Sequence, residues 1–463
     1  MLTFIRLLIS YLNTYFLGRI IYCFFCHSKG KQNIVSKFHS FYLGLGFTSI
    51  YFWFYTVLTN GNNTYYPILE YFTIILLYFG IKQKKIKPFG QIANIFKTKE
   101  KQSLVIDFLA KAIIILIILL CSIRCLHYPE GTWDAIAMWN IKAKFLSCGN
   151  EFWTGMFTDC FYYAHRDYPL FLSCIIARSF LYIETVNPIV PMIFSGFFCL
   201  SCFILPYLYL KTLKNQFCAL FAICLLSFSP NLFHNGCTQF ADIPLAVYFL
   251  VSLYELIVWD LKTKHQSPCL CIAFSSLCFW IKNEGIPWFI TYSLILFYYL
   301  YIKQNEYKHN NTSSCKRERC IFNFVSKPIL LFIPSFTASL SLKYLANINN
   351  DMLNGIFNRI NLVWLCERHL YIISYCWEFL KKHICIVIIP IFIILNLIDI
   401  KFKRFTILFL LIGIMYLCYY FMYLLTPYDI QWHLETSFSR IATDFLPSLI
   451  FLGCLLFSSQ SDK

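Results

Sequence analysis

Residues 105–126 read VIDFLAKAIIILIILLCSIRCL, an apolar run of 22 residues with only three charged side chains. A helix needs about 20 mainly apolar residues to cross the roughly 30 Å hydrocarbon core of a bilayer, so this run predicts a transmembrane helix. Eleven further apolar runs lie near residues 41–59, 65–82, 187–209, 216–230, 242–259, 268–281, 286–302, 327–343, 384–400, 405–425 and 441–458. The pattern therefore predicts an all-α polytopic membrane protein with about 12–13 spans.

The composition of the whole chain agrees with a lipid environment. Hydrophobic residues make up 59% of the 463 residues and charged residues 13%, and the mean hydropathy is +0.60. An ordinary soluble domain carries about 25% charged residues, so a soluble enzyme, a disordered scaffold and a secreted disulfide framework are excluded. The 22 cysteines are scattered through apolar runs without the paired spacing of zinc sites, so we expect them to be small buried hydrophobes, with no metal and no cofactor.

The basic residues predict the orientation of the spans. The formal charge is 39 − 23 = +16, and the cations cluster in short loops, which favours the positive-inside rule over nucleic-acid binding. The loops at 82–101 and 303–327 are therefore expected in the cytoplasm, together with the turns that hold Lys211, Lys214, Lys401, Lys403 and Arg404. All of these basic loops can lie on the cytoplasmic side only if residues 170–183, a short segment containing Arg178, do not cross the membrane. We expect that segment to be a juxtamembrane helix along the interface.

The first 25 residues form a further apolar segment that contains Arg6 and Arg19. A cleaved signal peptide is not expected, because Arg19 interrupts the apolar core and no small-residue cleavage site follows. Composition leaves open whether this segment crosses the membrane.

Five short motifs fall, under this topology, in loops on the side opposite the cytoplasm. Ionisable groups gathered on one face of a membrane protein indicate a functional site. The motifs are YPEGTWDAIAMWNIKAKFL (128–146), YYAHRDYPLFL (162–172), QFADIPLA (239–246), WIKNEGIPW (280–288) and TPYDIQWHLETSFSRIATDFLP (426–447).

The first motif predicts an amphipathic surface helix that Thr132 caps and that carries Asp134 in its first turn, with Lys142 on the same side. A purely structural interpretation is also open. In it, Asp134 complements the helix dipole, while Trp133 and Trp139 anchor the helix at the membrane interface.

The second and third motifs allow structural interpretations as well. Arg166 and Asp167 are adjacent and could form an ion pair at the rim of the membrane. Asp242 stands at the start of a span with Pro244 in the first turn, where a proline costs little, so it could serve as a cap.

The fourth and fifth motifs contain candidate anion-binding cations. Lys282 and Glu284 flank one residue in a tight turn and could simply neutralise each other. Arg440 could extend along the span to reach the interface, or it could bind a phosphate through its planar guanidinium. His433 has no second histidine at metal spacing, so we expect no metal there.

The order of these motifs resembles the GT-C superfamily of multi-spanning glycosyltransferases, in particular bacterial relatives of the protein O-mannosyltransferases and the lipid A aminoarabinose transferases. The resemblance covers roughly residues 105–455. It rests on W-D-A (Trp133 to Ala135), H-x-D-Y-P-L (His165 to Leu170), A-D-x-P-L-A (Ala241 to Ala246), K-N-E-G (Lys282 to Gly285) and a late arginine before a proline (Arg440, Pro447).

The resemblance implies an integral membrane enzyme that takes a sugar from a polyprenyl-phosphate carrier on the extracytoplasmic side. The host would be a bacterial inner membrane, with the site facing the periplasm or the exterior. Residues 104–458 would be the glycosyltransferase domain, and residues 1–103 an added transmembrane unit. The family's acidic residue in the first outer loop corresponds to Asp134, which would be the catalytic base. Asp167 takes the second acidic position, although Arg166 departs from the family pattern.

The chemistry of direct displacement at an anomeric carbon fits these residues. A carboxylate must accept the proton of the acceptor hydroxyl, and cations must stabilise the departing phosphate. The partners are then the lipid-linked donor, membrane lipid and an acceptor glycan, lipid or protein, but no nucleic acid. The residues expected at the donor site are Lys282, Glu284, Arg440, Asp242 and His165.

Two alternatives remain open. A transporter or lipid-sugar flippase would show paired repeats and ionisable groups near the middle of the bilayer. An O-antigen ligase or polymerase would share the outer site but depend on arginines in a long late loop, such as Arg359 and Arg368 in the segment 344–382.

Overall fold

The computed structural model describes residues 2–26, 33–83, 103–261, 268–310, 315–347, 362–382 and 404–457. These residues form helices and no strand, which confirms the predicted all-α polytopic class. Eight helical segments are long and apolar enough to cross a membrane, judged by length and composition: Leu2–Phe25, Ile34–Leu58, Leu104–His127, Ile189–Leu213, Asp242–Leu261, Gly285–Lys303, Arg404–Leu424 and Ile430–Leu456. The first segment, left open by its composition, is among them.

The other predicted runs correspond to shorter or bent helices. Gln216–Ser227 and Pro230–Cys237 form one apolar pair that bends by 74° at the break between them. The runs at 65–82, 268–281 and 327–343 coincide with the shorter apolar helices Tyr66–Gly80, Cys269–Ile281 and Leu330–Ala346. The run at 384–400 and most of the basic loops lie outside the described residues.

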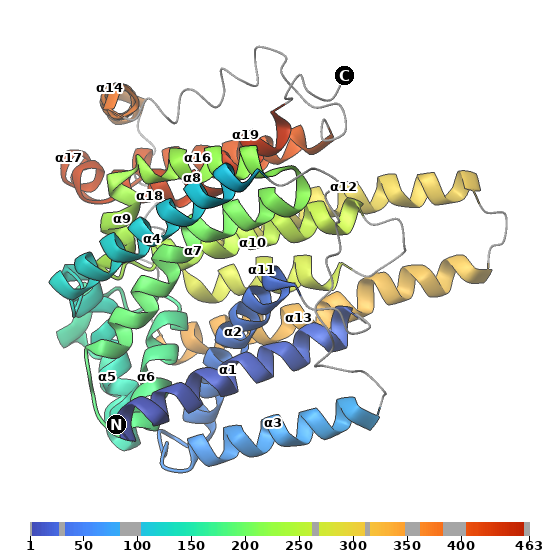
Figure 1. The fold of residues 1–463 in the computed structure, drawn as a ribbon. Coiled ribbons are helices and arrows are strands. Elements are labelled where there is room, and N and C mark those ends of the chain that lie inside the picture. The colour runs from blue at the N-terminus through green and yellow to red at the C-terminus, as the bar shows by residue number, and fades with distance from the viewer. Residues whose placement is uncertain are drawn as a thin grey trace. The chain divides into compact units, whose positions relative to one another are not determined.

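The chain divides into two compact units, and the first comprises residues 1–97, 128–194 and 251–346. Its helices include α1, α2, α3, α5, α6, α11, α12 and α13, several of which are labelled in Figure 1. Their bounds are Leu2–Cys26, Ile34–Leu58, Tyr66–Gln83, Ile141–Cys148, Phe171–Ile183, Cys269–Ile281, Gly285–Asn310 and Cys315–Ala346. The predicted boundary at residue 103 stays a prediction, but α1 to α3 share this unit with the segments that carry three of the five motifs.

Close backbone contact joins α1 to α2. A Cβ atom on Gly18 would lie 1.7 Å from the backbone oxygen of Ser40, and one on Gly44 would lie 1.9 Å from that of Thr14. Small residues allow helices in lipid to approach this closely, where van der Waals packing rather than the hydrophobic effect drives association. Any larger residue at either glycine would force the two helices apart.

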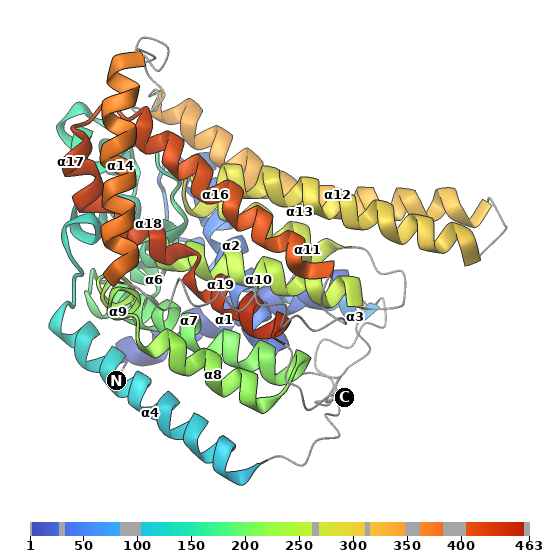
Figure 2. The same cartoon turned by 90° about the horizontal axis from the view of Figure 1, so that it is seen from above.

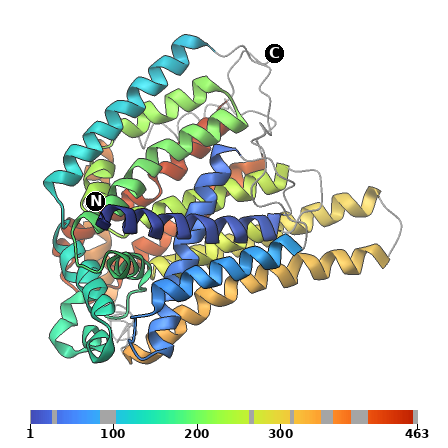
Figure 3. The same ribbon diagram turned by 60° about the horizontal axis from the view of Figure 1, so that its bottom comes forward.

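Helix α6 coincides with the segment expected along the membrane interface, but it is not a surface helix. Twelve of its 13 residues are buried. Arg178 is fully buried and donates from Nε to Glu70 Oε1 at 2.8 Å, so this charge is paired inside the unit. Figures 1 and 3 show α6 running across the direction of α1. The short length of α6 agrees with a helix that does not cross a membrane. The orientation of α6 relative to a membrane stays a prediction.

The second unit comprises residues 98–127, 195–250 and 347–463. Figure 2 shows its helix α4 (Leu104–His127) beside α8 (Gln216–Ser227). Its other helices are α9 (Pro230–Cys237), α14 (Leu362–Lys382), α16 (Ile407–Leu424), α17 (Ile430–His433), α18 (Ser439–Asp444) and α19 (Leu446–Leu456), while α7 (Ile189–Leu213) and α10 (Asp242–Leu261) contribute residues to both units.

Candidate functional site

The first motif forms a π-helix, Ala135–Asn140, that continues into α5. Asp134 precedes the π-helix and is half-buried, and its side chain makes no capping hydrogen bond. The expected cap from Thr132 is wrong, because its hydroxyl is buried without a hydrogen bond to any described residue. Trp133 is 70% exposed, as an interface anchor would be, whereas Trp139 is buried. Asp134 thus lies at the start of the helix, as both interpretations of this motif expected.

Lys142 corrects the prediction of a surface helix, because its side chain is buried. Its Nζ donates a 2.7 Å hydrogen bond to the backbone oxygen of His165 and lies 5.9 Å from the ring centre of Trp139. Burial lowers the pKa of Lys142 to about 7, although the negative charge of Asp167 opposes this shift. An amine with such a pKa can exchange a proton near neutral pH.

The second motif forms a turn that presents aromatic rings and a buried carboxylate. His165 has a left-handed backbone conformation, with φ of 42°. Its ring stacks on Tyr168 with centroids 5.1 Å apart, and Tyr168 stacks on Trp139 at 6.0 Å. The rim ion pair suggested for Arg166 and Asp167 is not formed as expected, because Arg166 pairs with the exposed Asp159 at 2.9 Å. Asp167 is buried instead.

The fourth motif contacts the second. The Asn283 side chain donates from Nδ2 to Asp167 Oδ2 at 2.9 Å. Lys282 and Glu284 form an ion pair of 2.9 Å with little exposure, so the neutralising interpretation of these two charges is confirmed. Gly285 closes the turn with a 2.9 Å hydrogen bond from its N–H to the Lys282 carbonyl. A Cβ there would lie 1.9 Å from the Cys278 oxygen, so the turn requires glycine.

Three polar atoms near these contacts have unused hydrogen-bonding capacity. Asn283 Oδ1, Glu284 Oε2 and Trp139 Nε1 are buried and form no hydrogen bond with the described residues. Buried polar atoms are rarely left in this state, and such exceptions often mark a place for water or a ligand.

Asp242 and Arg440 belong to the second unit. Asp242 is the first residue of α10, which agrees with its predicted position at the start of a span. Its side chain is buried. Arg440 is half-buried in α18, with its guanidinium carbon 4.6 Å from the ring centre of Phe240. In the fifth motif, Asp429 caps α17 by accepting from the Trp432 N–H at 2.8 Å.

Five of the seven predicted site residues belong to the first unit: Asp134, His165, Asp167, Lys282 and Glu284. Sequence analysis did not select Lys142, Trp139 or Asn283 as site residues. The sequence signal for Lys142 was its helical spacing from Asp134 within the first motif. The contact of Asn283 with Asp167 had no sequence signal.

No protein-family model, curated protein or solved structure matches this chain. The resemblance to the GT-C superfamily accordingly stays a prediction.

Proposed function

We propose that this chain is a membrane glycosyltransferase that moves a sugar from a polyprenyl-phosphate donor to an acceptor outside the cytoplasm. The observation that carries the proposal is the hydrogen bond between Asn283 and Asp167, which joins two motifs 116 residues apart. Together with the bond from Lys142 to His165, it gathers three of the five motifs in one unit. Residues that serve one reaction must meet in this way.

In this proposal, Asp134 accepts the proton of the acceptor hydroxyl. Its carboxylate is half-buried at the start of the π-helix, at the position that corresponds to the acidic residue of the family it resembles. Lys282 is the proposed partner of the donor phosphate within the first unit, while Arg440, the other cation predicted for the phosphate, belongs to the second unit. Because Glu284 already neutralises Lys282, donor binding would shift the Lys282 ammonium between the carboxylate and the phosphate.

Sugar recognition would involve the stacked rings of Trp139, Tyr168 and His165. The buried oxygens of Asn283 and Glu284 could accept hydrogen bonds from sugar hydroxyls. A site of this kind selects a sugar by the positions of its hydroxyls, because each unpaired buried group costs roughly 1–3 kcal/mol.

The proposal can be tested with the purified full chain in proteoliposomes that contain a panel of polyprenyl-phosphate hexoses and pentoses. We expect one donor to be consumed, with release of polyprenyl phosphate in the presence of envelope extract as acceptor. Asp134→Asn should lower the rate by about two to four orders of magnitude, the usual contribution of a general base. Asp159→Asn is the matched control, because that side chain lies in the same loop and is fully exposed.

A wild-type rate in Asp134→Asn would remove the assigned base and most of the case for this enzyme class. In cells, deletion of the gene should change the envelope glycans and cause lipid-linked sugar to accumulate. Lys282→Ala should instead raise the donor concentration needed for half-maximal rate, since Lys282 acts through the phosphate.

A transporter or flippase is the second candidate, and a specific observation favours it. Two buried contacts join ionisable side chains in helices of the first unit: the ion pair of Arg178 with Glu70, and the 2.5 Å contact of His39 Nδ1 with Glu255 Oε1. Buried ionisable groups in membrane helices often belong to ion or proton pathways. A flippase would move the lipid-linked sugar between leaflets without consuming it. The same proteoliposomes distinguish the two functions, because only a transferase lowers the total amount of lipid-linked sugar.

A ligase or polymerase has less support. Arg368 donates to the backbone oxygens of Thr426 and Tyr428, at 2.9 and 3.0 Å, and so has a structural role. Arg359, the other arginine of that loop, lies outside the described residues.

A further inference from the structure

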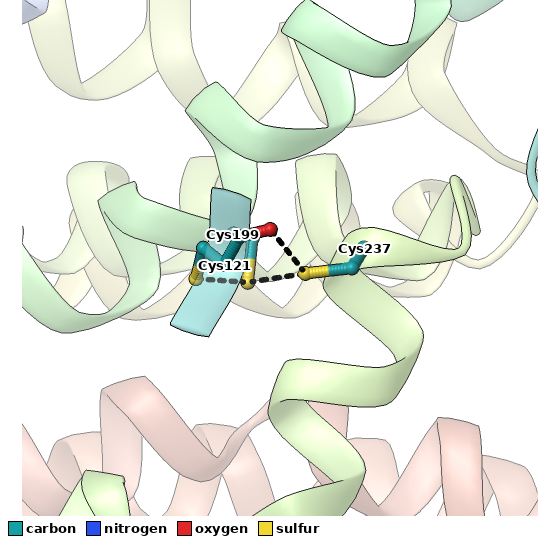
Figure 4. A group of neighbouring side chains, drawn as sticks. All are labelled: Cys121, Cys199 and Cys237. Carbon is teal, nitrogen blue, oxygen red and sulfur yellow. Dashed lines mark hydrogen bonds between the residues drawn. The ribbon is translucent and has the colours of Figure 1, made fainter. Parts of the chain in front are cut away.

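Three cysteines from three helices of the second unit meet in its interior. Cys121 comes from α4, Cys199 from α7 and Cys237 from the end of α9, and all three are buried. Figure 4 shows their side chains directed toward one another. The Sγ atoms of Cys121 and Cys199 are 3.5 Å apart, and those of Cys199 and Cys237 are 3.8 Å apart. All three sulfur atoms lie within 4.8 Å of one another.

These separations fit a shared metal ion. With metal–sulfur bonds of about 2.3 Å, two sulfur ligands of one ion stand about 3.8–4.0 Å apart at tetrahedral or trigonal angles. A disulfide would need only two of the three sulfurs and a much shorter distance of about 2.05 Å between them. The convergence of three sulfurs therefore favours a metal.

The backbone around the cluster is shaped to allow this approach. A Cβ on Gly236 would lie only 2.4 Å from Cys199 Sγ, so the glycine lets α9 come close to that thiol. The Ser195 hydroxyl of α7 donates to the Gly236 carbonyl and holds this contact. Cys125, one turn beyond Cys121 on α4, packs with its sulfur 3.5 Å from the position of a Cβ on Gly196.

We propose that Cys121, Cys199 and Cys237 bind one Cu(I) ion. Soft sulfur ligands select soft ions such as Cu(I), whereas structural zinc almost always takes four ligands. Within the part of the chain that the structure describes, the group has three potential ligands. Each bond to a thiolate forms as one S–H proton leaves, so three thiolates outweigh the single positive charge of Cu(I) and the occupied site is anionic.

A further contact joins α4 to α9, two of the helices that carry the thiols. Arg124, three residues after Cys121 in α4, is 2.9 Å from Nδ1 of His234 in α9, and Cys237 follows His234 by three residues. Side chains three residues apart lie on neighbouring parts of a helix surface. Arg124 is exposed, so this contact ties α4 to α9 at the surface, on the turns that carry the buried Cys121 and Cys237.

The ion would fasten α4 to the rest of its unit. The buried residues of α4 are Ala110, Ile117, Cys121 and Cys125, while its other faces are largely exposed. This buried stripe is narrow, and its side chains are small or medium in size. The turns that contain Cys121 and Cys125 therefore supply much of the contact between α4 and the rest of the unit. Copper binding should therefore raise the thermal stability of the chain in detergent.

The test uses the reduced, purified full chain in detergent, loaded anaerobically with Cu(I) in competition with a chromogenic Cu(I) chelator. We expect the triple variant Cys121→Ser, Cys199→Ser, Cys237→Ser to retain one copper ion fewer per chain than the wild type. Each single variant should bind at least about tenfold more weakly, because even second-shell changes weaken metal sites by 10- to 100-fold. The matched control is Cys174→Ser, Cys218→Ser, Cys269→Ser, which removes three buried thiols elsewhere.

Equal copper retention in the two triple variants would overturn the proposal. Two measurements on the wild type decide the matter even if the variants fail to fold. X-ray absorption of the bound copper should show three sulfur ligands at about 2.3 Å, and nitrogen or oxygen ligands would contradict the site. Mass spectrometry after alkylation should find free thiols at all three positions, and a disulfide between Cys121 and Cys199 in the isolated protein would also overturn it.

Discussion

The Asn283 amide donates a 2.9 Å hydrogen bond to the buried Asp167 carboxylate, linking the turn before α12 to the turn before α6. Both turns are short and are held by their own backbone hydrogen bonds, from Gly285 N–H to Lys282 O and from Tyr168 N–H to His165 O. The bond therefore fixes two preformed turns against each other, and with them the buried Lys282–Glu284 pair.

Replacing Asn283 should affect both stability and function. Asn283→Ala removes the donor and leaves the buried Asp167 with one partner fewer, which should cost about 1–3 kcal/mol of unfolding free energy. Asn62→Ala is the control, because Asn62 is exposed in a turn of the same unit. Thermal unfolding in detergent and sugar transfer would be measured together. If Asn283→Ala matched the control in both, the Asn283–Asp167 bond would have no role in the site.

Lys142 should make stability depend on pH. Burial lowers its folded pKa to about 7 from the ordinary lysine value of 10.5, so the unfolded chain binds more protons between these two pH values. The cost of burying the charged amine is complete below pH 7 and disappears as pH rises toward 10.5. The wild type should therefore gain stability from pH 7 to 9, relative to Lys142→Met, by up to about 1.4 kcal/mol per pH unit.

This comparison needs the difference between the two proteins, because tyrosines and thiols titrate in the same range. Denaturation at constant ionic strength, in steps of half a pH unit, would give the slope. Parallel stability curves for the wild type and Lys142→Met would show that Lys142 is charged or exposed in the folded chain.

Arg178 should be essential for the packing of α6. Besides Glu70, its guanidinium donates to the hydroxyls of Ser10 and Thr14, at 3.0 and 2.9 Å. Arg178→Met leaves the Glu70 carboxylate buried without its cation, which should destabilise the chain by about 3–5 kcal/mol. The double variant Arg178→Met, Glu70→Met should be less destabilised than Arg178→Met alone, since no buried charge is left unpaired.

The control for that experiment is the ion pair between Arg6 and Glu184 at 2.5 Å, which is partly exposed. Arg6→Gln should change the unfolding free energy by less than about 1 kcal/mol. Equal effects of Arg178→Met and Arg6→Gln would mean that the buried pair is accessible to water in the protein.

The predicted orientation can be tested by accessibility labelling. An epitope inserted at Ser147 should be reached from outside the cell, and one inserted at Gln91 from the cytoplasm, because cation-rich loops stay inside. Intact cells and permeabilised cells would be compared with the same antibody. Labelling of both sites from one side would invalidate the assignment of the five motifs to the outer face.

The amino-acid sequence was sufficient to predict the helical class, because membrane spans follow from the length and composition of local runs. The runs at 105–126 and 187–209 correspond closely to α4 and α7. The turn at Lys282 to Gly285 and its neutralised charge pair were also predictable, since glycine and adjacent opposite charges act over a few residues.

Tertiary structure decided the environments of single side chains. Lys142 was expected on a surface, yet packing of the first motif against the turn at His165 buries it and lowers its pKa. The buried pair of Arg178 with Glu70 spans 108 residues, and the sulfur cluster draws Cys121, Cys199 and Cys237 from three helices. Spacing along the chain carries no information on such contacts, because they depend on how helices approach one another and not on the period of any one helix.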